Sequence, residues 1–251
     1  MSEALVRLEQ VGKVFDNGAV ALRGLDLEVR KGQFTSLLGP SGCGKSTALR
    51  LIAGLSAPSS GRMHWSDGAR SGLSFVFQEP ALMPWRTVAG NVELPLRLQG
   101  MARADSGPRV AASLAQVGLS GFERAYPRQL SGGMRMRVSI ARALVTRPFL
   151  LLMDEPFAAL DEITRTRLND DLLRLHATER LTIVFVTHSV FESVFLSDRI
   201  MVMAPRPGRI VAEIDIEAPL ARDEVFRTGD LYNRQARAVS AALREAMADA
   251  A

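Results

Sequence analysis

The chain has 251 residues, of which 47% are hydrophobic and 23% are charged, with a formal net charge of +4. This length and apolar content suit one large α/β domain, with or without a subdomain, and exclude a disordered chain. The single cysteine excludes a disulfide framework and indicates a reducing compartment. No apolar run approaches the roughly 18 residues that cross a bilayer, and Met1 to Leu5 does not resemble a secretory signal. The basic residues are scattered, so no nucleic-acid surface is expected.

The first forty residues predict short strands that lead into a glycine-rich loop. Val6 to Val14, Ala19 to Leu27 and Phe34 to Leu38 carry apolar positions with turn residues between them. The third strand runs into Gly39-Pro40-Ser41-Gly42-Cys43-Gly44-Lys45-Ser46, which fits the phosphate-binding pattern G-x-x-x-x-G-K-[ST]. Thr47 to Leu55 follows at helical spacing. Strand, loop and helix in this order predict a site for a nucleoside triphosphate.

Each residue type in this loop suits phosphate. Glycines let the backbone wrap around phosphate groups, and the N-terminus of the helix supplies free N–H groups and positive potential. Lys45 is predicted to reach the β- and γ-phosphates, and the Ser46 hydroxyl to ligate Mg²⁺. The Cys43 thiol, beside Lys45, is expected to have a lowered pKa and raised reactivity. The alternative is that it only fills a variable position. The predicted nucleotide-binding residues of this segment are Gly39, Pro40, Ser41, Gly42, Cys43, Gly44, Lys45, Ser46 and Thr47.

A second predicted strand, Leu73 to Phe77, ends at Gln78, which alone could be a plain surface residue. The segment after it carries Met83 and Trp85 among turn residues. Large apolar residues in a loop favour a docking surface for a partner helix, and the alternative is local core. The chain from Val88 to Thr146 looks helical, with breaks at glycines.

The second half of the chain predicts two buried strands that end in polar residues. Phe149 to Met153 is a continuous apolar run, as in a parallel strand covered on both faces, and Asp154 and Glu155 follow it. Asp154 is predicted to hold Mg²⁺ through water, and Glu155 to accept a proton from an attacking water. Leu181 to Val186 forms the next strand and ends at Thr187-His188.

Ser131-Gly132-Gly133 stands between the phosphate loop and the acidic strand and precedes a predicted helix, Met134 to Thr146. A hydroxyl and free N–H groups at a helix N-terminus suit an anion. The order of loop, Ser-Gly-Gly turn and acidic strand resembles the ATP-binding cassette ATPases. In that family the turn meets the γ-phosphate held by a second copy, so the resemblance implies an ATP-dependent head-to-tail dimer. Met134 and Met136 replace the glutamines that are common there.

The resemblance also implies roles for four single residues. Gln78 would touch Mg²⁺ or the attacking water, and His188 would contact the γ-phosphate. Phe15 would stack on adenine, with a core phenylalanine as the alternative. Asp161 closes a segment, Ala158 to Asp161, that matches the family's dimer-contact loop.

The segments 77–88, 186–199 and 205–210 look like the nitrate, sulfonate and taurine group of bacterial importer ATPases, which includes relatives for pyrimidine-type vitamin precursors. This implies an α/β P-loop domain over residues 1–217, with a parallel core sheet, an N-terminal antiparallel β subdomain and a helical subdomain near 88–147. Residues 218–251 form a short helical tail.

The implied activity is hydrolysis of MgATP by a peripheral subunit at the cytoplasmic face of the membrane. It would drive separate integral membrane permease subunits, supplied by an extracytoplasmic solute-binding protein, and would bind no nucleic acid. The alternative is a soluble cassette ATPase of DNA repair or translation. The interval between Gln78 and Ser131 carries no sustained heptad pattern, which argues against the repair type.

Overall fold

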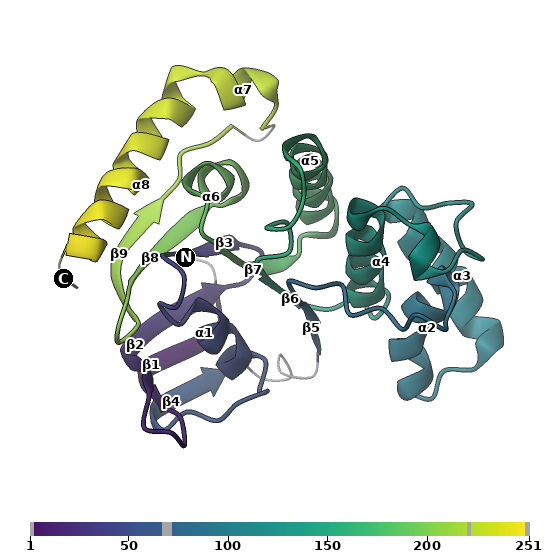
Figure 1. The fold of residues 1–251 in the computed structure, drawn as a ribbon, viewed down its shortest axis with the longest axis horizontal. Helices are drawn as coiled ribbons and strands as arrows, with labels where there is room; N and C mark the ends of the chain where they lie inside the picture. Colours follow the sequence, from purple (N-terminus) through teal and green to yellow (C-terminus); the bar gives the residue numbers. More distant parts are fainter. Residues whose placement is uncertain (1–2, 67–71, 220–221, 249–251) are drawn as a thin grey trace.

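The computed structural model describes residues 3–66, 72–219 and 222–248 of the chain. Among these residues, two sheets form (Figure 1). The smaller sheet is antiparallel with the order β2-β1-β4, and the larger has the order β5-β6-β7-β3-β8-β9. The strands of the smaller sheet are β1 (Ala4–Val14), β2 (Val20–Arg30) and β4 (Ser60–Trp65). Those of the larger are β3 (Phe34–Leu38), β5 (Leu73–Val76), β6 (Leu150–Asp154), β7 (Thr182–Thr187), β8 (Arg199–Ala204) and β9 (Arg209–Asp215).

Strands β5, β6, β7, β3 and β8 run parallel, and β9 adds an antiparallel edge. Every residue of β3, β6, β7 and β8 is buried, as expected for strands that are covered on both faces. Because side chains alternate along a strand, each core strand contributes to both faces of the sheet. Leu151 and Met153 of β6 belong to one hydrophobic cluster, and Leu150 and Leu152 to the other.

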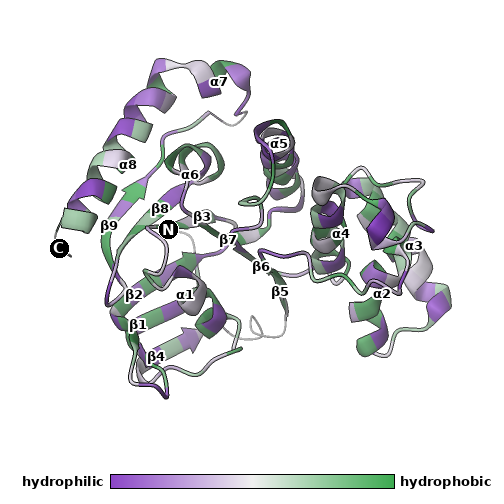
Figure 2. Ribbon diagram, viewed as in Figure 1, coloured by the Kyte–Doolittle hydropathy of each residue, from purple (hydrophilic) through white to green (hydrophobic). Residues whose placement is uncertain are grey.

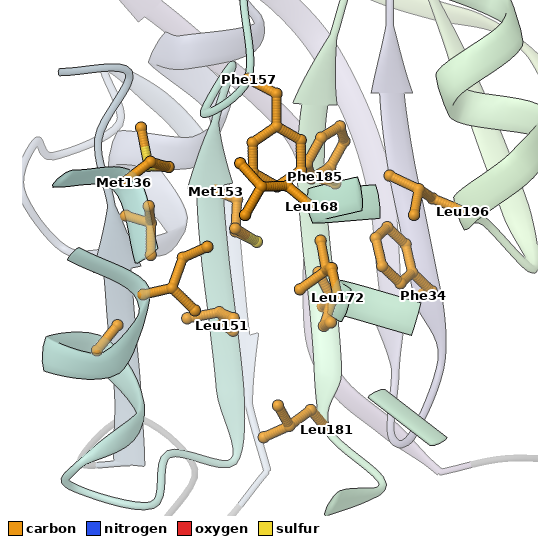
Figure 3. Close-up of a cluster of buried hydrophobic side chains, with 14 of the residues drawn as sticks. Phe34, Met136, Leu151, Met153, Phe157, Leu168, Leu172, Leu181, Phe185 and Leu196 are labelled. Carbon is orange, nitrogen blue, oxygen red and sulfur yellow. The ribbon is translucent and has the colours of Figure 1, made fainter. Parts of the chain in front are cut away.

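Helices cover the two faces differently. Helix α1 (Lys45–Ile52) packs between the antiparallel sheet and one face of the core sheet. Helices α5 (Glu162–Glu179), α6 (Val190–Leu196), α7 (Glu224–Thr228) and α8 (Asp230–Ala248) contribute buried residues to the opposite cluster. Leu168 and Leu172 of α5 belong to the same cluster as Phe185 of β7 (Figure 3). Figure 2 shows hydrophilic and hydrophobic bands alternating along α8, as expected for a helix with one buried face.

Three further helices stand beside the β5 edge of the core sheet (Figure 1). They are α2 (Val88–Leu98), α3 (Arg103–Gln116) and α4 (Gly132–Leu144), with a 3-10 turn at Pro127–Gln129. Helix α2 begins at Thr87, whose hydroxyl accepts a hydrogen bond from the Gly90 amide at 3.2 Å. The residues after α2 and α3, Gly100 and Gly118, have positive φ angles, which glycine adopts without strain.

The predicted class, an α/β fold with a parallel core sheet and an antiparallel β subdomain, is confirmed. The sequence does not predict strand β4, because most of its residues are exposed and it shows no apolar run. The helix expected from Met134 begins earlier, at Gly132, so both glycines of the Ser-Gly-Gly turn lie in its first turn. Within the described ranges, no helix has the length and apolarity to cross a membrane.

Candidate functional site

The glycine-rich loop connects the end of β3 to the start of α1. Gly42 and Gly44 have φ angles of +78° and +95°, and a Cβ at Gly44 would come within 3.0 Å of the Ala21 carbonyl oxygen. A Cβ at Gly39 would lie 2.8 Å from the Met203 carbonyl oxygen. A Cβ at Gly42 would meet no heavy atom within 4 Å other than those of its chain neighbours. Backbone strain and close packing therefore require glycine here, and the loop keeps an unfilled side that suits a phosphate chain.

The Lys45 side chain, only 4% exposed, lies at the centre of this loop. Its ammonium donates to the carbonyl oxygens of Gly39 at 2.8 Å and Pro40 at 3.0 Å. The same nitrogen lies 3.5 Å from Oε1 of Glu155. The fold thus places the lysine charge between the phosphate loop and the carboxyl end of β6.

A hydroxyl and a carboxylate meet next to this lysine. The Ser46 Oγ donates to Oδ1 of Asp154 at 2.7 Å. Burial raises the pKa of the Asp154 carboxyl, although the Ser46 hydrogen bond opposes the shift. No group of three His, Cys, Asp or Glu side chains in the described ranges could hold a metal by itself. One carboxylate and one hydroxyl fit Mg²⁺, which keeps several waters and takes further oxygens from substrate phosphates.

Glu155 follows Asp154 and has an unusual backbone, with a φ of +43°. Its amide donates to the Val186 carbonyl oxygen on the neighbouring strand at 3.1 Å. Its Oε2 lies 3.0 Å from Nδ1 of His188, which follows β7. A glutamate held in this sparsely populated conformation, with partners for both carboxylate oxygens, is typical of a functional site.

Two other predicted nucleotide contacts lie on exposed surface. Gln78 follows β5, whose carboxyl end lies at the same edge of the sheet as Asp154. Phe15 follows β1 with 43% of its surface exposed, and the Lys13 ammonium lies 5.6 Å from its ring centroid. The alternative of a buried core phenylalanine is therefore wrong, and the ring face is accessible for stacking.

The Ser-Gly-Gly turn and the predicted dimer loop lie side by side. Ser131 is the exposed N-cap of α4, and its Oγ accepts from the Met134 amide at 3.2 Å. Asp161 is the exposed N-cap of α5, and the Thr164 amide that it binds holds the pKa of its carboxyl below the ordinary value. A Cβ at Gly133 would lie 2.5 Å from Cγ2 of Thr164, so the helix starts pack closely. Among the described residues, no hydrogen bond or ion pair joins this turn to Lys45 or Ser46.

The expectation of a reactive Cys43 is wrong. The side chain is fully buried, and burial raises the pKa of the thiol. The charge of Lys45 and backbone hydrogen bonds lower it, but they do not outweigh desolvation. Cys43 therefore fills space beneath the loop and belongs to the hydrophobic cluster around α1.

The loop after Gln78 presents Trp85 to solvent, with 73% of its surface exposed, so the local-core alternative is wrong for this residue. Two side chains that sequence reasoning missed hold the loop. The amide of Asn91 binds both the N–H (2.7 Å) and the carbonyl (3.2 Å) of Met83. Arg142 donates to the carbonyl oxygens of Pro80 and Ala81, each at 2.8 Å. No local pattern indicates these long-range bonds.

A protein-family model described as ABC transporter matches residues 22–158. An aliphatic sulfonates import ATP-binding protein of Pseudomonas syringae pv. syringae is 46% identical over 225 residues, which are 89% of this chain and 90% of that protein. An uncharacterized ABC transporter ATP-binding protein of Methanocaldococcus jannaschii is 45% identical over 88% of this chain and 86% of its own length.

Solved structures agree. A component of the ABC transporter complex cbiONQ from Clostridium perfringens superposes with a TM-score of 0.77 at 26% identity, over 85% of this chain and 89% of its own. A dimeric ATP-binding cassette bound to ADP and Pi superposes with a TM-score of 0.74 at 32% identity, over 85% of this chain and all of its own.

Proposed function

Because the chain belongs to the ABC transporter family and is the ATP-hydrolysing subunit of an importer, we propose how its residues divide the work of hydrolysing MgATP. The observation that carries the proposal is the position of the Glu155 carboxylate. One oxygen faces Lys45 at 3.5 Å and the other faces His188 at 3.0 Å. The carboxylate is thus held between the phosphate loop and the end of β7.

In this proposal, the loop of residues 39–47 binds the phosphates through its free backbone N–H groups, which Pro40 lacks, and through the Lys45 ammonium. Ser46, Asp154 and Gln78 would hold Mg²⁺. The metal supplies charge neutralisation on the phosphate oxygens. Glu155 accepts the proton of the attacking water, a contribution of about 10²- to 10⁴-fold. His188 contacts the Glu155 carboxylate through Nδ1 and so orients it, and in its doubly protonated form it would also donate from Nε2 to the γ-phosphate. Phe15 stacks on the adenine ring.

A second copy of the chain completes the site. Ser131 and Gly132 present a hydroxyl and a helix N-terminal amide at the surface, beside Asp161, and the buried Gly133 follows them. Because no contact within the described chain joins them to Lys45, we propose that they meet the γ-phosphate of the opposite copy. The dimeric cassettes among the similar structures support this arrangement.

The cassette works at the membrane through other proteins. We propose that it binds integral permease subunits at the cytoplasmic face through the loop that carries Trp85, and that a solute-binding protein outside delivers the cargo. The exposed indole and the bonds that hold its loop support the contact. The importer names of the relatives favour this assembly over a soluble cassette of repair or translation.

The cargo that we propose is a small organic sulfonate. Support comes from relatives named for aliphatic sulfonate import, at 43–46% identity over most of the chain. Nitrate, taurine and pyrimidine-type precursors are the other cargoes of the group that the sequence resembles.

Growth of a strain that lacks this gene tests the proposal. The strain is expected to grow with sulfate and to fail with an alkanesulfonate as the only sulfur source. The wild-type gene should restore growth, and Glu155→Gln should not. Normal growth on every sulfonate, with failure on nitrate as nitrogen source, would instead assign the nitrate cargo.

A further inference from the structure

Glu192 is a buried acidic side chain that the proposed ATP chemistry does not use. It lies in the first turn of α6 with 9% of its surface exposed. Burial raises the pKa of its carboxyl. The charged or titratable groups that face it are Arg165 from α5 and His188 from the loop after β7, and both favour the carboxylate form. Burying a carboxyl group costs free energy unless it is hydrogen-bonded, so the partners of Glu192 indicate what the side chain is held for.

The side chain of Glu192 is part of a closed set of hydrogen bonds. Its Oε2 accepts from the Thr187 hydroxyl at 2.5 Å. The same hydroxyl accepts from the Ser189 amide at 3.0 Å. The Ser189 hydroxyl in turn accepts from the Glu192 amide at 3.2 Å. Both sequence neighbours of His188, Thr187 and Ser189, therefore take part in this set of hydrogen bonds.

This arrangement departs from an ordinary helix cap. Ser189 and Glu192 have the S-x-x-E spacing of a capping box, in which the glutamate binds the N-cap amide directly. Here the Thr187 hydroxyl takes that amide and passes the bond on to the carboxylate. A helix cap alone does not need this third residue, whereas the added bonds tie down the chain on both sides of His188.

The buried polar groups near Glu192 also support a role beyond capping. Among the described residues, Oε1 of Glu192, Oδ1 of Asn169 and Nε of Arg165 are buried without a hydrogen-bond partner. Glu192, His188 and Glu155 also line one small cavity. Unpartnered buried polar atoms cost stability, so those of Glu192 and Arg165, which line the same cavity as His188, indicate a functional constraint.

We propose that Glu192 is a positioning residue, which acts through the Thr187 hydroxyl to hold His188 against Glu155. The inference rests on the proposed function, because it takes His188 and Glu155 as the working pair. A side chain displaced by about 1 Å can cost on the order of 100-fold in rate. Loss of the Glu192 acceptor therefore lowers kcat for ATP and leaves KM nearly unchanged, since the phosphate loop is intact.

The test compares five variants with His188→Ala in steady-state ATPase assays. Glu192→Ala and Thr187→Val are expected to lower kcat between about 10- and 100-fold, with the ATP KM within about threefold of wild type. Their double variant is expected to be no slower than the slower single one, because both substitutions remove the same Thr187–Glu192 hydrogen bond. Glu192→Gln keeps an acceptor oxygen and should restore kcat. Ser189→Ala is the matched control. It removes the side-chain cap of α6 and should lower Tm, but it leaves the Thr187–Glu192 bond, so kcat should stay closer to wild type than in Glu192→Ala.

The chemical shifts of the histidine rings in NMR spectra distinguish a displaced His188 from general destabilisation of the fold. The chain has three histidines, so Glu192→Ala should shift the His188 signal and leave those of His64 and His176 in place. Unchanged kcat in both Glu192→Ala and Thr187→Val, or multiplicative losses in the double variant, would overturn the inference. If His188→Ala itself kept the wild-type rate, the proposed function would fail instead.

Discussion

Nδ1 of His188 lies 3.0 Å from Oε2 of Glu155, although 33 positions separate the two residues in the chain. The contact arises because β6 and β7 are parallel neighbours whose carboxyl ends open at the same edge of the sheet. Lys45, which follows β3 on the other side of β7, lies 3.5 Å from the second carboxylate oxygen. Parallel strands thus bring residues from three distant segments around one carboxylate.

The Glu155→Gln variant is expected to bind MgATP and to lose turnover by about 10²- to 10⁴-fold, because an amide cannot accept the proton of the attacking water. ATP should then hold two chains together, and light scattering with and without ATP would show the doubled mass. Glu179→Gln, at the far end of α5, is the control with wild-type behaviour. A monomeric Glu155→Gln variant that hydrolyses ATP at the normal rate would contradict both the base and the shared site.

Ser46→Ala removes the hydroxyl that binds Asp154 and is expected to raise the Mg²⁺ concentration for half-maximal ATPase by at least about tenfold. Ser46→Thr keeps the hydroxyl and should remain near wild type. Titration of Mg²⁺ into chelator-treated protein measures the shift. Equal Mg²⁺ dependence of both variants would remove Ser46 from the predicted metal site.

Phe15→Ala is expected to weaken ATP binding by about 1 to 3 kcal/mol, the usual contribution of an aromatic ring stacked on a base. Phe15→Trp should bind ATP at least as well as wild type. Because the ring is largely exposed, Tm should change little in either variant. Fluorescent-ATP titration checks the affinity, and an Ala variant with wild-type affinity would show that adenine lies elsewhere.

Trp85→Ala is expected to keep basal ATPase activity and stability, because its side chain is 73% exposed. Permease-stimulated turnover should fall. Truncation of a buried aromatic such as Phe185 typically costs about 3 to 5 kcal/mol and serves as the contrasting case. Thermal unfolding measured beside transport in reconstituted vesicles separates the two effects. Full transport by the Trp85→Ala variant would exclude this loop as the permease contact.

Cys43 is expected to react with maleimide in urea but only very slowly in the native protein, since the thiol is buried and its pKa is raised. The raised pKa of the Cys43 thiol also makes the stability of the fold depend on pH. The neutral thiol supports the fold fully below the unfolded pKa, near 8.5, and this contribution is lost as pH rises through the folded value.

Urea unfolding at pH 7 and at about pH 10 checks the thiol prediction. The wild type should lose more stability between the two conditions than Cys43→Ser, which has no thiol to ionise. Native protein that labels as fast as unfolded protein would contradict the burial of Cys43.

The sequence by itself determined the local parts of this protein. The spacing of Gly39, Gly44 and Lys45 specifies a loop that is closed by bonds between near neighbours, and the apolar runs of β6 and β7 specify strands buried on both faces. Such features depend on residues a few positions apart, so a single chain segment reveals them.

The tertiary structure decided what depends on distant segments. The pKa of Cys43 follows from the packing of α1 between two sheets, and Lys45 alone predicts the wrong direction. Strand β4 exists because β1 pairs with it, although its own residues show no strand pattern. The role of Glu192 appears only where α5 and α6 close over the end of β7, because burial and hydrogen-bond partners are properties of packed elements.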